Sequence, residues 1–238
     1  MSSASLQGSV AVITGASRGI GAAVAIELAR LGAHCVLTGR TQGGLEETDD
    51  AIRALGGRAT LLPFDLVDDA EQIDLLGPSI VERFGRLDVL VHAAGLLAKL
   101  TPVAHIEASD WANSVAVNLS STWRLIRTME PPLRAAPAGR AVFLTDLRAA
   151  VPSAYFGLYS ASKAAQRHLA LCWAEELVAT SVRVNLAEPG PVGTRLRRAG
   201  WPGENQAMLA QPADVAPGIA ALCLAGETRN GQVIRLHQ

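Results

Sequence analysis

Short runs of β-branched and leucine residues recur along the chain, each about as long as one strand. Parallel strands that are buried on both faces read as short apolar runs almost free of charge. We therefore predict strands at residues 10–13, 34–38, 59–62, 87–91, 141–145, 182–186 and 233–236. Longer amphipathic or apolar stretches lie between these runs and predict helices at 19–31, 44–55, 69–84, 107–129 and 158–178.

The alternation of strand and helix predicts right-handed βαβ units, and hence a parallel sheet with helices on both faces. No internal repeat and no glycine-serine or charged linker divides the sequence. The segment PPLRAAPAG at 131–139 is only long enough to end one helix and lead into the next strand. We expect residues 1–238 to form a single α/β domain, a Rossmann-type doubly wound parallel sheet of about seven strands.

Residues 193–211 break the alternation with glycine, proline and large apolar side chains. A long connection of this composition suits a substrate lid over a pocket. It also suits a plain surface excursion, and the sequence leaves both open.

Composition limits the class of ligand. Hydrophobic residues make up 49% of the chain and the formal net charge is −1. A large core is therefore available, and nothing draws the whole protein to nucleic acid or to an anionic membrane. A small-molecule substrate is the expected partner, with no nucleic acid and no membrane.

The three cysteines and five histidines show no metal-ligand spacing, so no metal site is expected. The widely separated cysteines also predict no disulfide framework. The sequence shows neither a signal-peptide pattern nor an apolar run long enough to span a membrane. These features predict a soluble protein of the cytoplasm.

A glycine-rich loop follows the first predicted strand and opens a helix, with the sequence TGASRGIG at 14–21. Gly15 permits a tight turn, Gly19 lets the backbone approach a pyrophosphate, and Gly21 lets the helix pack close to the strand. The helix N-terminus then offers free N–H groups and a positive dipole to the phosphates. Glycines also form ordinary turns, but this position favours dinucleotide binding.

The second strand decides which dinucleotide is expected. An acidic residue about 20 residues after the loop would hold the ribose hydroxyls of NAD, but no acid lies between Glu27 and Glu46. Arg18 stands in the loop and Arg40 follows the strand. Guanidinium groups pair well with phosphate, so these two residues predict NADP(H). The other interpretation is that both are solvated surface residues.

Tyr159 and Lys163 lie four residues apart on a predicted helix, so their side chains share one face. A nearby ammonium favours the phenolate and lowers the pKa of a tyrosine, which makes the phenol a usable general acid or base. A lone Tyr-x-x-x-Lys pattern is common by chance, and its value here comes from the motifs around it.

Taken with the glycine loop, this pattern resembles the short-chain dehydrogenase/reductase family, and the resemblance runs through essentially the whole chain in the family's order. The matching segments are TGASRGIG at 14–21, FDL at 64–66, HAAG at 92–95, VAVNLS at 115–120, YSASK at 159–163 and PGPVGT at 189–194. The resemblance implies an oxidoreductase that uses a nicotinamide cofactor. It also implies a homodimer or homotetramer built through residues 107–129 and 158–178.

The resemblance assigns roles to particular residues. Together with the argument above for Arg18 and Arg40, it gives cofactor binding to Gly15, Ser17, Arg18, Gly19, Ile20, Gly21, Arg40, Asp65, Leu66, Ala93, Ala94, Gly95, Tyr159, Lys163, Pro189, Gly190, Val192 and Thr194. It gives catalysis to Tyr159 and Lys163, helped by Asn118 through a water relay near Lys163.

Some of these residues have simpler explanations. Asp65 holds the adenine in the family, but it can also cap a helix that starts near Asp68. HAAG can be a tight passage from strand to helix as well as a surface for the cofactor. Thr194 can cap a helix, bond the nicotinamide amide, or do both.

Asp146 departs from the family, which usually carries a serine thirteen residues before the tyrosine. An ionised carboxylate accepts hydrogen bonds only, so it cannot donate to a substrate carbonyl. Its negative charge also repels a developing oxyanion and raises the pKa of Tyr159. Thr145 replaces the serine only if the strand end twists, and Arg148 neutralises Asp146 only if the loop brings them together. The ending GQVIRLHQ also lacks the family's usual Asp-Gly-Gly.

Three functions remain open from these residues. One is weak carbonyl reduction with Asp146 protonated; another is reduction of a cationic C=N bond that Asp146 complements. The third is a catalytically weak or inactive NADP(H)-binding protein with a sensing or assembly role. We favour reversible hydride transfer between NADP(H) and a small, largely apolar carbonyl or C=N compound, with Asp146 part of the catalytic group.

Overall fold

A computed structural model describes residues 5–236. The apolar runs form a single seven-stranded sheet in the order β3-β2-β1-β4-β5-β6-β7, and every neighbouring pair is parallel. The strands are β1 (Val10–Thr14), β2 (His34–Gly39), β3 (Arg58–Pro63), β4 (Val89–His92), β5 (Arg140–Leu144), β6 (Arg183–Glu188) and β7 (Val233–Arg235). The Rossmann-type fold predicted from the alternation is confirmed.

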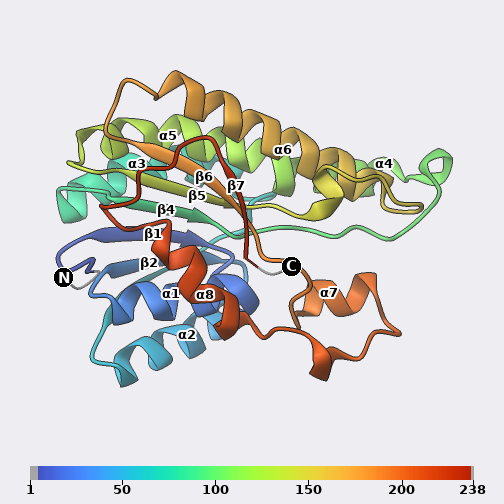
Figure 1. Ribbon diagram of the computed structural model, residues 1–238, viewed down its shortest axis with the longest axis horizontal. Helices are drawn as coiled ribbons and strands as arrows, with labels where there is room; N and C mark the ends of the chain where they lie inside the picture. The colour runs from blue at the N-terminus through green and yellow to red at the C-terminus, as the bar shows by residue number, and fades with distance from the viewer. Residues whose placement is uncertain (1–4, 237–238) are drawn as a thin grey trace.

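Helices cover both faces of this sheet (Figure 1). They are α1 (Gly19–Arg30), α2 (Gln42–Ala54), α3 (Ala70–Phe84), α4 (Ala108–Val115), α5 (Ser121–Ala135), α6 (Gly157–Glu176), α7 (Arg195–Gly200) and α8 (Pro212–Ala221). In Figure 1, α3, α5 and α6 lie above the sheet, and α1, α2 and α8 lie below it. In the part of the chain that the structure describes, no helix is both long and apolar enough to cross a membrane.

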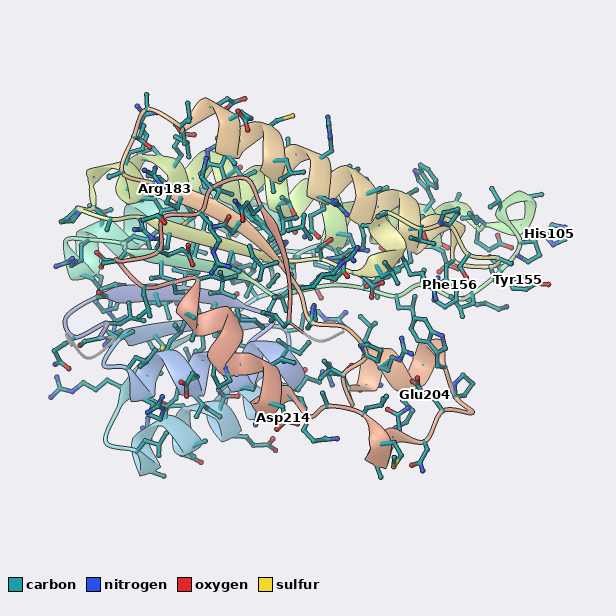
Figure 2. All side chains as sticks on the ribbon, in the orientation of Figure 1. His105, Tyr155, Phe156, Arg183, Glu204 and Asp214 are labelled. Atoms are coloured by element: carbon teal, nitrogen blue, oxygen red, sulfur yellow. The ribbon has the colours of Figure 1, made fainter. Side chains whose placement is uncertain are left out.

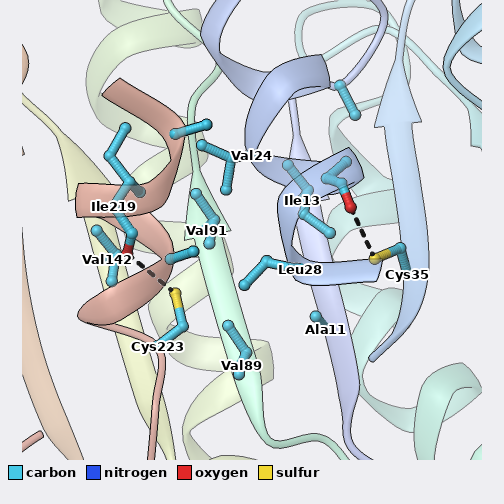
Figure 3. Packing of buried hydrophobic residues seen from close by; sticks show 14 of the residues in the cluster. Ala11, Ile13, Val24, Leu28, Cys35, Val89, Val91, Val142, Ile219 and Cys223 are labelled. Carbon is cyan, nitrogen blue, oxygen red and sulfur yellow. Dashed lines mark hydrogen bonds between the residues drawn. The ribbon is translucent and has the colours of Figure 1, made fainter. Parts of the chain in front are cut away.

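The core has two layers, one on each face of the sheet. Below the sheet, Ile13 and Val91 pack against Leu28 of α1 and Ile219 of α8 (Figure 3). Above it, Phe143 meets Trp173 of α6 edge to face, with ring centroids 6.1 Å apart. Apolar side chains on both faces explain why the strands carry so little charge.

The strand order reverses between β1 and β4, and this point positions the functional site. In open α/β sheets, ligands bind outside the carboxyl ends of the strands at such a switch point. The parallel register pairs Thr14 with His92 at these ends. Their side chains are hydrogen-bonded, with Thr14 Oγ1 2.7 Å from His92 Nδ1. The glycine loop and the HAAG segment therefore start side by side.

The predicted helix at 107–129 is wrong in two respects. A π-helical turn, Ala116–Ser120, separates α4 from α5. The helix then continues through Pro131 and Pro132 to Ala135. Each proline removes a helical hydrogen bond, but burial of Pro132 and Leu133 in the core holds this last turn in place.

The sequence prediction also missed α8 and the short helix α7 inside residues 193–211. Pro212 stands in the first turn of α8, and the Gln211 backbone N–H donates to Asp214 Oδ2 at 2.6 Å. Proline in the first turn followed by an acid is a helix-start signal. The Pro-Ala-Asp-Val-Ala-Pro-Gly sequence of α8 is otherwise typical of a loop, which masks this signal.

We predict that Gly77→Ala destabilises the fold although alanine is the better helix former. A Cβ at Gly77 of α3 would lie 2.0 Å from the carbonyl oxygen of Thr128 in α5, so the two helices would have to separate. The free energy of unfolding, measured by urea denaturation, should fall by about 2 kcal/mol or more. Gly43→Ala is the matched control, because nothing lies within 4 Å of its Cβ. Equal stability of the two variants would contradict the close packing of α3 on α5.

Candidate active site

The carboxyl ends of the strands surround a cavity of about 890 Å³. The predicted cofactor residues that line it are Gly15, Ser17, Arg18, Gly19, Ile20, Gly21, Arg40, Asp65, Leu66, Ala93, Ala94, Gly95, Pro189, Gly190, Val192 and Thr194. Asp146, Tyr159 and Lys163 line the same cavity. Asn118 lies behind its wall, where the neighbouring Val117 faces the cavity instead. Segments spread over most of the chain are thus brought to one place.

The glycine loop has the shape of a phosphate cradle. A Cβ on Gly15 would lie 2.8 Å from the Cα of Ala94, and one on Gly21 would lie 2.3 Å from the carbonyl oxygen of Gly15. Gly15 and Gly19 both have positive φ angles, of 66° and 59°. Within the described chain, no side chain caps the first turn of α1. Its N–H groups therefore stay available to an anion, so the loop fits a dinucleotide pyrophosphate.

Arg40 and Asp65 come together at the ends of β2 and β3. The Arg40 Nε lies 3.6 Å from Asp65 Oδ2, and the Arg40 side chain is 61% exposed. An exposed ion pair of this kind contributes little to stability, so Arg40 can exchange Asp65 for a phosphate at small cost. Arg18 is also exposed and lines the cavity. The strand end therefore presents arginine where an NAD site would present an acid.

Asp65 and Thr194 hold local turns as well as lining the cavity. Asp65 Oδ1 accepts from the Val67 backbone N–H at 2.7 Å, whereas α3 begins later, at Ala70. Asp65 therefore caps a turn ahead of that helix. Thr194 does cap a helix, because its Oγ1 accepts from the Arg197 N–H at 3.1 Å. A Cβ on Gly19 would lie 3.6 Å from the Thr194 methyl group, so the starts of α1 and α7 are close.

The hydroxyl of Tyr159 is hydrogen-bonded to Asp146, the residue that departs from the family pattern. The hydroxyl donates to Asp146 Oδ2 at 3.5 Å, while Asp146 Oδ1 accepts from the Arg148 N–H at 2.8 Å. Burial raises the pKa of Tyr159, and the charge of Asp146 and this hydrogen bond raise it further. The sequence argument from Lys163 predicted the opposite direction for the pKa. Burial and Asp146 determine the direction here, and the Lys163 ammonium donates to Leu144 and Gln166 instead.

Lys163 is buried, with 4% of its surface exposed. Its Nζ donates to the Leu144 carbonyl oxygen at 2.7 Å and to Gln166 Oε1 at 2.5 Å. Burial lowers the pKa of Lys163 to about 8, although the charge of Asp146 acts in the opposite direction. At neutral pH the amine is therefore protonated but only weakly basic.

Asn118 lies in the π-helical turn. Its Oδ1 accepts from the Leu96 N–H at 2.8 Å, and its Nδ2 donates to the Leu96 carbonyl oxygen at 2.9 Å and to Ser162 Oγ at 2.9 Å. The side chain therefore joins the segment after β4 to α6. The backbone carbonyl oxygen of Asn118 accepts a hydrogen bond from Thr122 Oγ1 at 3.2 Å. The same Thr122 oxygen accepts from Gln166 Nε2 at 3.2 Å.

The side chain of Arg148 does not neutralise Asp146. Its guanidinium carbon lies 5.5 Å from the ring centroid of Phe156 and 5.8 Å from that of Trp201. Among the described residues, Asp146 forms no ion pair. Its charge therefore acts on Tyr159, on the Lys163 ammonium and on any ligand in the cavity.

Trp201 joins residues 193–211 to the loop before α6. Its ring lies 4.9 Å from that of Phe156, and the Arg197 guanidinium stacks over it at 3.6 Å. Arg197 forms two 2.6 Å hydrogen bonds with Glu204, which cancels its charge locally. Figure 2 shows Phe156 and Glu204 at the same end of the molecule, where α7 projects. Arg197 and Trp201 both line the cavity.

The family model described as short chain dehydrogenase matches residues 9–205. The chain belongs to this family. It is therefore an oxidoreductase of the short-chain dehydrogenase type, and the resemblance seen in the motifs is confirmed.

The similarity to known proteins covers most of the chain. The enzyme is 32% identical to the uncharacterized oxidoreductase YciK of Escherichia coli K12, over 87% of this chain and 83% of that protein. It is 30% identical to the 3-oxoacyl-[acyl-carrier-protein] reductase FabG of Pseudomonas aeruginosa, with the same coverage of 87% and 83%. A crystal structure of a Shigella flexneri 2a protein complexed with NADP has a TM-score of 0.93, 29% identity and 98% coverage of both chains.

Sequence reasoning missed part of the cavity wall of this dehydrogenase. Phe64 and Gly193 lie inside the quoted motifs without an assigned role. Beyond the motifs, the wall includes Thr38, Gly39, Leu96, Leu97, Leu144, Thr145, Arg195, Leu196, Arg197, Ala199, Trp201, Gln211 and Pro212. Most of these residues adjoin a motif or a strand end, a signal that could have found them. Leu97, Ala199 and Trp201 come from connections whose path the sequence does not determine.

Proposed function

We propose that this enzyme is an NADP(H)-dependent oxidoreductase that reversibly reduces a small, largely apolar carbonyl or C=N compound. The observation that carries the proposal is the buried phenol of Tyr159, which lines the cavity between Asp146 and the segment bearing Lys163. When bound, NADPH supplies the hydride. The glycine loop, Arg18 and Arg40 would hold its phosphates, and Lys163 would bond its nicotinamide ribose.

Tyr159 supplies the proton in this proposal. Burial and Asp146 raise the pKa of its hydroxyl, so it remains protonated at neutral pH and can donate to an oxygen or nitrogen that gains electrons. The protonated Lys163 favours the phenolate that remains after donation. A sensing protein without turnover would have no use for a phenol and an ammonium buried at one cavity.

An apolar substrate suits the apolar side chains of the cavity wall. The cavity is lined by Leu96, Leu97, Val117, Leu196 and Trp201 among others. Because Glu204 pairs with Arg197, that guanidinium is poorly placed to hold an anionic substrate. We propose that residues 193–211 act as a lid, clamped by the stack of Arg197 on Trp201.

Reduction of a C=N bond is favoured by one observation in particular. The Asp146 carboxylate is bonded to the Tyr159 hydroxyl, while the Arg148 side chain stacks on aromatic rings. A negative charge without a direct ion pair opposes an alkoxide but stabilises a cationic iminium group. A protonated nitrogen in the substrate would form the direct ion pair that Asp146 lacks among the described side chains.

We also propose a homodimer or homotetramer formed through the surface of α4, α5 and α6. Trp111 of α4 and Trp123 of α5 are 51% and 47% exposed, which suits an interface.

The cysteines Cys35, Cys172 and Cys223 are free thiols, and a reducing compartment such as the cytoplasm suits them.

Replacing Tyr159 tests the general acid. With NADPH and a panel of small ketones, aldehydes and cyclic imines, Tyr159→Phe should reduce kcat at least about a hundredfold, because no proton donor remains. Loss of nicotinamide absorbance measures turnover. Tyr155→Phe is the control, since that side chain is 60% exposed. No turnover by the unmodified enzyme on any compound would favour a cofactor-binding protein without this activity.

Replacing Arg40 tests the cofactor. Arg40→Ala should weaken NADPH binding at least about tenfold and leave NADH binding unchanged, because a charge-assisted bond to the 2′-phosphate is lost. Dissociation constants come from nicotinamide fluorescence. Arg58→Ala, at the opposite end of neighbouring β3, is the control. An unchanged ratio of the two constants would exclude Arg40 from phosphate recognition.

Replacing Asp146 separates the two substrate classes. Asp146→Ser removes a repulsive charge and adds a donor, so kcat/KM on a neutral ketone should rise about a hundredfold. The same variant should lose activity on a cyclic iminium compound. Asp146→Ala removes the charge without adding a donor, so its comparison with Asp146→Ser distinguishes the loss of charge from the gain of a donor. Equal activity of all three proteins on both substrates would mean that Asp146 does not contact the reacting group.

A further inference from the structure

Gln166 is a fully buried polar side chain in α6, one turn beyond Lys163. An amide removed from water is destabilising unless its donors and its acceptor are bonded. An apolar side chain of similar size would fill the same space between α5 and α6. The identity of the partners of Gln166 therefore indicates what the amide does.

The partners form a continuous chain of hydrogen bonds. Lys163 Nζ donates to Gln166 Oε1 at 2.5 Å, and Gln166 Nε2 donates to Thr122 Oγ1 at 3.2 Å. The Thr122 hydroxyl donates in turn to the Asn118 carbonyl oxygen at 3.2 Å. Every donor points in the same sense, away from the ammonium. The π-helical turn therefore connects to Lys163 entirely through protein groups.

The number of N–H donors on the Lys163 ammonium decides what this chain of hydrogen bonds leaves for a ligand. An ammonium has three N–H donors. The Leu144 carbonyl oxygen and Gln166 Oε1 accept two of them, both on the protein side. Because Lys163 also lines the cavity, the third is left for a bound ligand. Without Gln166, the ammonium would keep one protein acceptor and would be free to rotate.

We propose that Gln166 is a positioning residue, whose amide oxygen fixes both the orientation and the charge of Lys163 beside Tyr159. Its role depends on the proposed proton transfer, but the charge of Lys163 can be measured without any substrate. The other charged or titratable groups near the amine are Asp146, Tyr159 and His92. Asp146 favours the ammonium, whereas burial disfavours it and lowers the pKa of Lys163 to about 8.

The chain contains only two lysines, Lys99 and Lys163, which makes a direct titration possible. In protein labelled with ¹³C-lysine, the two side chains give separate NMR signals, and the exposed Lys99 is an internal reference. Gln166→Met removes the acceptor at similar volume and should lower the titration midpoint of Lys163 by about one pH unit, tenfold in acid dissociation constant. Gln166→Glu places a carboxylate there and should raise the midpoint by at least as much.

Opposite shifts from two substitutions at one position are not expected of a residue that only fills the core. Thr128→Val is the control for destabilisation, since Thr128 is a buried, hydrogen-bonded residue of α5 remote from Lys163. It should leave the midpoint unchanged. Thr122→Val breaks the next link and should lower the midpoint less than Gln166→Met does, which provides a second test if the methionine variant does not fold.

NADPH binding gives a second readout. Gln166→Met should weaken NADPH binding at least about fivefold at pH 7, because the third N–H is no longer aimed at the ligand. Midpoints that do not move, or that move in the same direction in Gln166→Met and Gln166→Glu, would overturn the proposal. If the midpoints shift as expected while no substrate is reduced, the positioning of Lys163 stands and the proposed reaction fails.

Discussion

The register of β1 against β4 is the constraint on which the cavity depends. It pairs Thr14 with His92, and their hydrogen bond joins the two strand ends from which the glycine loop and the HAAG segment start. Thr14 Oγ1 also accepts from the Ala94 N–H at 3.2 Å. The loop can then approach Ala94 so closely that only glycine fits at position 15. Burial lowers the pKa of His92 to about 3, so this link stays uncharged at neutral pH.

Burial also determines the chemistry at the other end of the cavity. The same removal from water raises the pKa of the Tyr159 phenol and lowers that of the Lys163 amine, so both charged forms become less favourable. The Asp146 carboxylate stabilises the ammonium but opposes the phenolate. The acid form of Tyr159 is therefore favoured by its surroundings as well as by its chemistry. This balance suits proton donation to the substrate better than proton removal from it.

Much of the fold was predictable because each element has a local signal. Apolar runs with little charge located the strands, and the glycine loop and the Tyr-Lys spacing predicted residues that line one cavity. The errors came from places where packing overrides local preference. Pro131 and Pro132 suggest a helix end, but the buried Leu133 keeps the last turn of α5 helical. The capping signals of α8 were present in the sequence but were hidden by a loop-like composition.

By itself, the sequence determined which chemical groups reach the carboxyl edge of the sheet, because a parallel βαβ chain brings every strand end there. It also determined that arginine, and no acid, follows β2. Only the tertiary structure decided how these groups pair. Lys163 bonds to Gln166 and Leu144, Arg148 stacks on Phe156 and Trp201, and Asp146 is left to Tyr159. The physical reason is that side-chain partners depend on distances across helices and loops, which spacing along the chain does not specify.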